Sequence, residues 1–148
     1  NMESKTLPGF TTIEFGDSSR LFVDHGELIR EGSIIDVSGI FTVIPVEGLI
    51  ACTVTSEIVS GETVYTTVLN FMIKDIPCYT RRLIYDLTII DCCFRLTDVY
   101  KEKYLLGLNA KPHPTVKPSF KSEGLPSGVR VFPVEIQYIN THSILQLV

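Results

Sequence analysis

Residues 49–73 read LIACTVTSEIVSGETVYTTVLNFMI, and this stretch decides the fold class. Its second half, from residue 62 on, is crowded with β-branched and aromatic residues, which favour extended backbone. The pair Ser60-Gly61 separates the two halves and is typical of a tight two-residue hairpin turn. We therefore predict an antiparallel hairpin. Its second strand is apolar on both faces, so we expect it to be central and covered on each side.

A second period-two pattern lies near the end of the chain, in GVRVFPVEIQYIN (residues 128–140). Such alternation of apolar and polar residues predicts a strand with one buried face. Pro133 has no N–H for a sheet ladder, so we expect this strand to lie at an edge or to contain a bulge. The predicted buried face holds Phe132, Val134, Ile136 and Tyr138.

Further strands are predicted on both sides of the first hairpin. Residues 83–98, LIYDLTIIDCCFRLTD, are interpreted as one long, kinked strand, which returns after the charged tip VYKEK as KYLLGL. A 3.6-residue apolar period is found nowhere, apart from a short helical turn near residues 75–81. The shorter predicted strands span residues 10–15, 20–24, 28–37 and 40–46.

Together these segments predict an all-β chain: a single-domain antiparallel β-sandwich or barrel with about eight to ten strands. The domain is expected to span residues 1–148, because a chain of 148 residues is most simply one domain. Residues 1–8 are predicted to be a flexible N-terminus. Asn1, which precedes Met2, is interpreted as a remnant of expression.

Composition restricts the classes of partner. The net charge is −4, and no run of Lys or Arg exceeds the pair Arg81-Arg82, which argues against nucleic acid as a partner. No apolar stretch approaches the length of a membrane span, and the start is not a signal peptide. The mean hydropathy of +0.24 nevertheless predicts apolar surface that meets another subunit or a partner protein. The four cysteines, Cys52, Cys78, Cys92 and Cys93, are expected to be buried, reduced thiols of a cytoplasmic protein.

The most suggestive chemical motif is IEFGDSSRL at residues 13–21. A strand followed by Gly-Asp-Ser resembles the nucleophile block of the GDSL esterases, and the resemblance would make Ser18 the nucleophile. That family also has an Asp-x-x-His pair near the C-terminus, whereas here Ile139 stands three residues before His142. Gly-Asp-Ser-Ser is also ordinary turn chemistry, and we favour the turn.

Metal, cofactor and acid–base sites find little support. The metal candidates are His25, His113 and His142, the cysteines, and Asp24 or Asp91, and they lack the short spacings of ligand pairs. No phosphate-binding glycine motif is present. We predict no metal and no cofactor. Asp86 and Asp91 have opposite strand parity, so we expect one to pair with an arginine and the other to meet solvent.

The segment YLLGLNAKPHPTVKP, residues 104–118, ends a strand and then holds three prolines around His113. Pro112, Pro114 and Pro118 do not form the PxxP spacing of a peptide ligand. Prolines fix φ and extend the residue before them, so we predict a stiff crossover between strands. His113→Ala is then expected to leave folding and any activity intact.

The run FRLTDVYKEKYLLGLNAKPHP, residues 94–114, resembles small all-β proteins of phages and prophages, of the tail-associated or assembly type. The resemblance implies a structural role and assigns no catalytic residue.

We therefore expect a non-enzymatic structural or assembly protein, in the cytoplasm or in an assembled particle, that forms homo-oligomers or binds other structural proteins. Contact is expected through β-edges and apolar sheet faces. One alternative is a barrel that binds a small apolar ligand between Phe71, Tyr85, Phe94 and Tyr138; a fainter one is the Ser18 hydrolase. SILQLV at the end of the chain is either a contact strand or the last strand of its own sheet. The candidate interface residues are Pro133, Glu135, Gln137, Ile144, Leu145 and Leu147.

Overall fold

The computed structural model describes residues 2–6, 9–24, 29–108, 110–119 and 131–148, with side chains from residue 9 onward. Its described part is mainly β-structure, as predicted, with twelve strands, one α-helix and one short 3-10 helix. The strands are β1 (Met2–Thr6), β2 (Phe10–Asp17), β3 (Phe22–Asp24), β4 (Ile34–Ser38), β5 (Thr42–Val43), β6 (Val46–Val59), β7 (Glu62–Lys74), β8 (Cys92–Asp98), β9 (Lys103–Leu106), β10 (Thr115–Pro118), β11 (Val131–Asn140) and β12 (Leu145–Leu147). The helices are η1 (Ser18–Arg20) and α1 (Thr80–Ile89).

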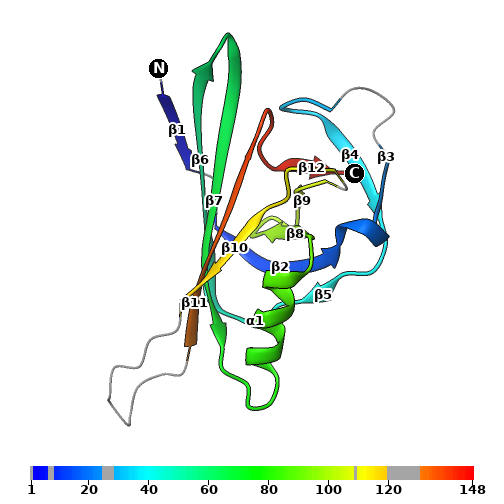
Figure 1. Cartoon of the computed structure of the whole chain (residues 1–148), viewed down its shortest axis with the longest axis vertical. Helices are drawn as coiled ribbons and strands as arrows, with labels where there is room; N and C mark the ends of the chain where they lie inside the picture. Colours follow the sequence, from blue (N-terminus) through cyan, green and yellow to red (C-terminus); the bar gives the residue numbers. More distant parts are fainter. Residues whose placement is uncertain (1, 7–8, 25–28, 109, 120–130) are drawn as a thin grey trace.

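The strands form one continuous, strongly curved sheet (Figure 1). Its order is β10-β11-β7-β6-β2-β8-β9-β12-β4-β3, with β1 added to β6 and β5 added to β2. The path has two ends, β10 and β3, so these strands do not close a barrel. The pairing of β6 with β7 shifts register between Glu47 and Ala51, and β6 meets β2 only at Ile50. This irregularity lets the sheet turn from its long β6-β7-β11 half into the β2-β8-β9 half.

The predicted hairpin at Ser60-Gly61 is confirmed. Both turn residues have positive φ, 51° and 84°, and Val59 pairs with Glu62 across the turn. These angles are those of a type I′ turn, whose twist matches that of the flanking strands. The strand β7 is central, between β6 and β11, but it is covered on one face only, because Asn70 and Met72 are exposed. The expectation that both faces are covered was therefore wrong.

The long strand predicted for residues 83–98 is also wrong in its first half. Residues 80–89 form α1, and the strand β8 begins only at Cys92. Leu83, Ile84 and Leu87 are buried on one side of the helix, at the i, i+1, i+4 spacing of an amphipathic helix. The helix packs this side against the sheet, so the residues predicted to form a strand are instead a cover for the core (Figure 1).

Two apolar clusters lie on opposite faces of β8 and β9. The larger lies between the two halves of the sheet and α1 and includes Leu69, Phe94 and Ile136; the smaller is closed by Leu21, Val23 and Ile35. Adjacent strand residues point to opposite faces, and accordingly Cys92 belongs to the larger cluster and Cys93 to the smaller. The prediction that these two cysteines face opposite ways is confirmed.

Other strand predictions need adjustment at their ends. β4 begins at Ile34 rather than at residue 28, since Ser33 N–H donates to the carbonyl of Arg30 in a turn. Residues 2–6 were predicted to be flexible, but they form β1 and pair antiparallel with β6. The charged tip after β8 is a hairpin turn as predicted: Asp98 accepts hydrogen bonds from the N–H groups of Tyr100 and Glu102.

Pro133 does not mark an edge strand, because β11 lies between β7 and β10. Ser119 N–H donates to the carbonyl of Pro133, so the main-chain groups of Pro133 point toward β10. The strand β10 ends at Pro118, one residue before this bond. The nitrogen of Pro133, which carries no hydrogen, therefore lies opposite the end of the β10-β11 ladder, so at most one main-chain hydrogen bond is lost there. The alternation predicted for β11 is confirmed by the burial of Val134, Ile136 and Tyr138.

Candidate functional site

A depression of about 650 Å³ lies between the end of α1 and the chain that leads into β10. It is open to solvent and has walls of two kinds. One wall is formed by the last turn of the helix and the residues after it, and the other by the proline segment. The lining residues are Leu87, Thr88, Ile90, Asp91, Lys111, Pro112, His113, Pro114, Thr115 and Val116.

The depression contains an imidazole–carboxylate pair that the sequence did not predict. His113 Nε2 lies 3.7 Å from Asp91 Oδ2; the His113 side chain is 16% exposed and that of Asp91 67%. The other ring nitrogen, His113 Nδ1, is enclosed and has no hydrogen-bond partner in the described structure. The tautomer that suits this setting carries its proton on Nε2, facing the carboxylate.

This geometry does not suit general-base catalysis. In a catalytic Asp–His pair, the nitrogen remote from the carboxylate takes the proton from the nucleophile. Here the remote nitrogen is Nδ1, which is enclosed. The pair therefore orients the ring and leaves the Asp91 carboxylate as the polar group that solvent reaches. The prediction that His113→Ala is harmless stays a prediction.

Pro118 removes a hydrogen-bond donor from the outward edge of β10. Because Ser119 bonds to Pro133, its directly opposite residue, the main-chain groups of residues 115, 117 and 119 point toward β11. Those of Val116 and Pro118 point away from the sheet, and Pro118 has no N–H. Along β10 the outward edge thus presents one donor, the N–H of Val116. The predicted crossover is confirmed, since the segment leads from β9 to the distant strand β10.

Gly107 helps to form this crossover. Its φ is +94°, and a Cβ at this position would lie 3.0 Å from the ring of Pro114. A larger residue would meet both an unfavourable φ and a close contact, so the strand β9 ends and the chain bends at glycine.

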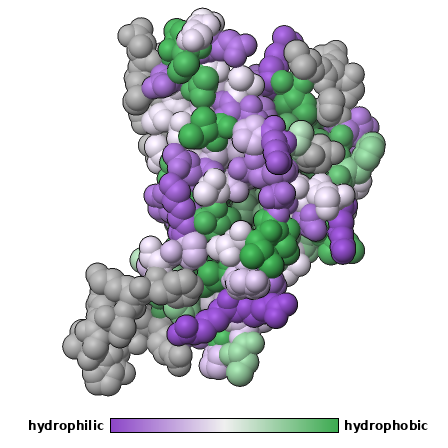
Figure 2. Space-filling model, in the orientation of Figure 1, coloured by the Kyte–Doolittle hydropathy of each residue, from purple (hydrophilic) through white to green (hydrophobic). Residues whose placement is uncertain are grey.

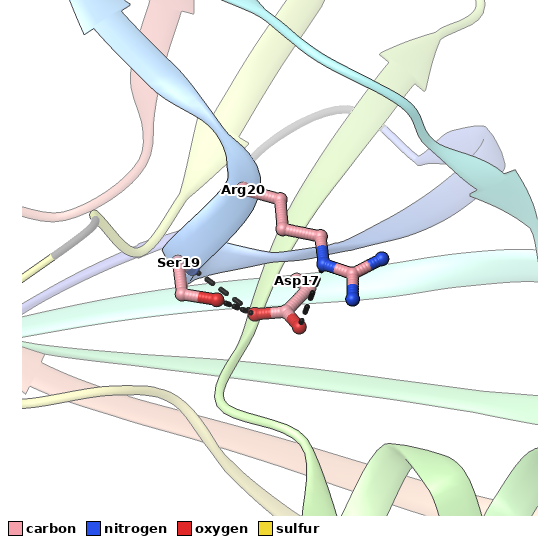
Figure 3. Close-up of polar contacts among 3 residues, drawn as sticks. All are labelled: Asp17, Ser19 and Arg20. Atoms are coloured by element: carbon pink, nitrogen blue, oxygen red, sulfur yellow. Dashed lines mark hydrogen bonds and ion pairs between the residues drawn. The ribbon is translucent and has the colours of Figure 1, made fainter.

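The Gly-Asp-Ser-Ser motif is a turn. The Asp17 carboxylate accepts hydrogen bonds from the hydroxyl and the N–H of Ser19, at 2.7 and 3.0 Å, and lies 4.0 Å from Arg20 Nε (Figure 3). The hydrogen bond from the Ser19 hydroxyl, followed by that from its N–H, lowers the pKa of Asp17. Ser18 is buried, and its N–H donates to the main-chain carbonyl of Asp91 at 2.9 Å. The described contacts of this motif are those of a cap for η1.

His142, the other candidate base, belongs to a separate buried network. Its Nδ1 lies 2.9 Å from the carbonyl of Ser143 and its Nε2 lies 3.4 Å from the hydroxyl of Tyr138, which also accepts from Asn140. Burial raises the pKa of Tyr138. Ser143 donates through its N–H and its hydroxyl to Glu31. This network joins β11 to the turn before β4, and no sequence motif indicates it.

The other candidate ligands and carboxylates lie apart. In the part of the chain that the structure describes, no three His, Cys, Asp or Glu residues are grouped as a metal site; His25 lies outside that part. Asp86 pairs with Arg82 at 3.2 Å along α1, as expected of one of the two carboxylates. A further pair unites β2 and β8: Arg95 binds Glu14 through two hydrogen bonds and stacks on Phe41.

The four rings proposed to line a cavity do not do so. Phe71, Phe94 and Tyr138 are buried in the larger apolar cluster, while Tyr85 is 56% exposed on α1.

The residues proposed for an interface divide into two groups. Ile144 and Leu145 are buried within this chain, and β12 pairs with β9 and β4, so SILQLV is a strand of its own sheet. The remaining four are accessible in part: Pro133 is exposed, and Glu135, Gln137 and Leu147 are half-buried.

All four cysteines are free thiols. Cys52, Cys92 and Cys93 are buried as predicted, but Cys78 is exposed. None of the described helices is long and apolar enough to cross a membrane. No family model, curated protein or solved structure matches this chain.

Proposed function

We propose that this chain is a non-enzymatic structural or assembly protein, of the kind found in phage and prophage particles, that associates with further copies of itself. The observation that carries the proposal is the number of large hydrophobic side chains exposed on the described surface. Sixteen large hydrophobic side chains are exposed there, including Phe22 at 66%, Ile34 at 62% and Ile40 at 87%. Hydrophobic side chains lie in patches among polar ones on the face drawn in Figure 2. Exposed apolar patches of this kind mark surfaces that meet other proteins.

The β3 end of the sheet is the better surface for this association. β3 is the last strand of the path and pairs only with β4, whereas the other end, β10, has Pro118 at an outward position. Val23 and Val37 face the smaller core, so Phe22 and Ile34 lie on the opposite, outer face of β3 and β4. On this outer face Phe22 and Ile34 flank the exposed cross-strand pair Asp24 and Asp36, so a second copy would contact the two apolar side chains and leave these carboxylates at the solvent-exposed rim. The resemblance of residues 94–114 to phage-type proteins agrees with such a role.

Analytical ultracentrifugation over a hundredfold range of concentration tests the proposal. We expect association that weakens in the double variant Phe22→Thr, Ile34→Thr. The matched control, Ile58→Thr with Val59→Thr, removes two exposed hydrophobic residues at the tip of the β6-β7 hairpin and should associate like the wild type. A monomer at every concentration would contradict self-association. Equal weakening in both variants would contradict the choice of surface.

A further inference from the structure

The depression beside β10 has the dimensions of a small-molecule site. Its volume, about 650 Å³, lies within the range of roughly 300–1,000 Å³ that is typical of such sites. Half of its lining residues are apolar and half are polar, so it offers both a contact surface and orienting groups. The apolar ones are Leu87, Ile90, Pro112, Pro114 and Val116.

The strongest hydrogen-bond acceptors around the depression gather at the end of α1. The helix α1 ends at its rim, and the last carbonyls of a helix carry a partial negative charge. The Asp91 carboxylate adds a full negative charge at the same place, and most of its surface is open to solvent. On the opposite wall, the prolines retain their carbonyls but lack N–H groups. Donors are present as well, namely the Val116 N–H, the ammonium of the exposed Lys111 and the Thr115 hydroxyl, so acceptors predominate only at the end of α1, around Asp91.

The same proline spacing argues against a peptide strand as the occupant. Strand addition draws its affinity from main-chain hydrogen bonds to both donors and acceptors of an edge. Along β10 only the Val116 N–H is available as an outward donor, because Pro118 supplies none. A compact ligand that needs only acceptors and an apolar wall suits the depression better than an extended chain.

We propose that this depression binds a small organic cation, an amine or amidine with an apolar body. The cationic group lies between the Asp91 carboxylate and the C-terminal end of α1. The apolar body lies on Ile90 and on the ring of Pro112. His113 holds the carboxylate from the other side. The site is distinct from the surface of the assembly role proposed above, since none of the residues that line it belongs to β3 or β4.

Binding of three probes of similar shape to the full chain tests the proposal: phenethylamine, 2-phenylethanol and 3-phenylpropionate. We expect saturable binding of the amine at millimolar concentration, measured by NMR titration, with the alcohol weaker and the acid weakest. Asp91→Asn should weaken amine binding about tenfold, the order expected for a charge-assisted hydrogen bond. Asp86→Asn is the matched control, because it removes a carboxylate of α1 that is paired with Arg82, and it should change binding less than twofold.

Four results would overturn the proposal. The first is the absence of saturable amine binding at millimolar concentration in wild-type protein with a folded spectrum. The second is a preference for the acid, lost in Lys111→Gln, which would make the depression an anion site. The third is unchanged amine binding in Asp91→Asn. A lysine-containing pentapeptide that binds more tightly than phenethylamine would show that the edge accepts a strand, and would also refute the small-molecule assignment.

Discussion

Leu87 and Ile89 provide a sharp test of the helix that replaces the predicted strand. Residues two apart lie on the same face of a strand but about 200° apart around a helix. In the structure, Leu87 is 1% exposed within the larger apolar cluster, whereas Ile89 is 58% exposed. If these residues form a helix, Leu87→Ala and Ile89→Ala should lower the free energy of unfolding by different amounts. If they form a strand, the two losses should be similar.

The expected magnitudes follow from burial. Truncation of a fully buried leucine removes its contacts and leaves a cavity, which costs about 3 kcal/mol. Truncation of an exposed isoleucine changes the free energy of unfolding by roughly 0.5 kcal/mol or less. In a chain of this size, a loss of about 3 kcal/mol lowers Tm by about 10 °C.

Urea unfolding followed by far-UV circular dichroism measures both free energies, with the slope m as a check on the two-state assumption. Leu87→Ala should lower the midpoint strongly, and Ile89→Ala should leave it almost unchanged. Equal losses of unfolding free energy in the two variants would refute the helix. A larger loss for Ile89→Ala would mean that the opposite side of the helix, which carries Ile89, packs against the core.

Two further predictions concern the β10 edge and the thiols. Pro118→Val should add an outward N–H to β10 and increase light scattering at high concentration, whereas Pro133→Val, whose new N–H faces Ser119, should not; equal scattering would contradict the proposed edge. In native protein a thiol reagent at pH 8 should modify Cys78 rapidly and the three buried cysteines only on unfolding; rapid reaction of all four would contradict their burial. Burial raises the pKa of the Cys52, Cys92 and Cys93 thiols to about 12, above the ordinary value of 9.0. The folded state therefore keeps these thiols protonated where the unfolded state loses the protons, so their contribution to stability is complete below pH 9 and is lost as pH rises toward 12. Unfolding measured at increasing alkaline pH would detect this loss.

Local chemistry made part of this structure predictable. The Ser60-Gly61 turn, the alternation in β11 and the Asp98 turn each depend on residues within a few positions of one another. The all-β class, the opposite directions of Cys92 and Cys93 and the crossover after Gly107 follow from the same short-range rules. The prediction of one strand across residues 83–98 failed because a short apolar run is compatible with both the two-residue period of a strand and the 3.6-residue period of a helix. Only packing against the larger apolar cluster selects the helix.

The amino-acid sequence by itself thus determined the β-hairpin turns at Ser60-Gly61 and after Asp98 and the alternation of β11, because turn geometry and side-chain alternation act between neighbours. Tertiary structure alone decided which strands end the sheet, and so placed Pro118 rather than Pro133 at an outward edge. It also brought His113 to Asp91, which lies 22 residues earlier in the chain. The physical reason is that these contacts arise from the curvature of the sheet and the docking of α1, which sum over the whole core and leave no trace in residue spacing.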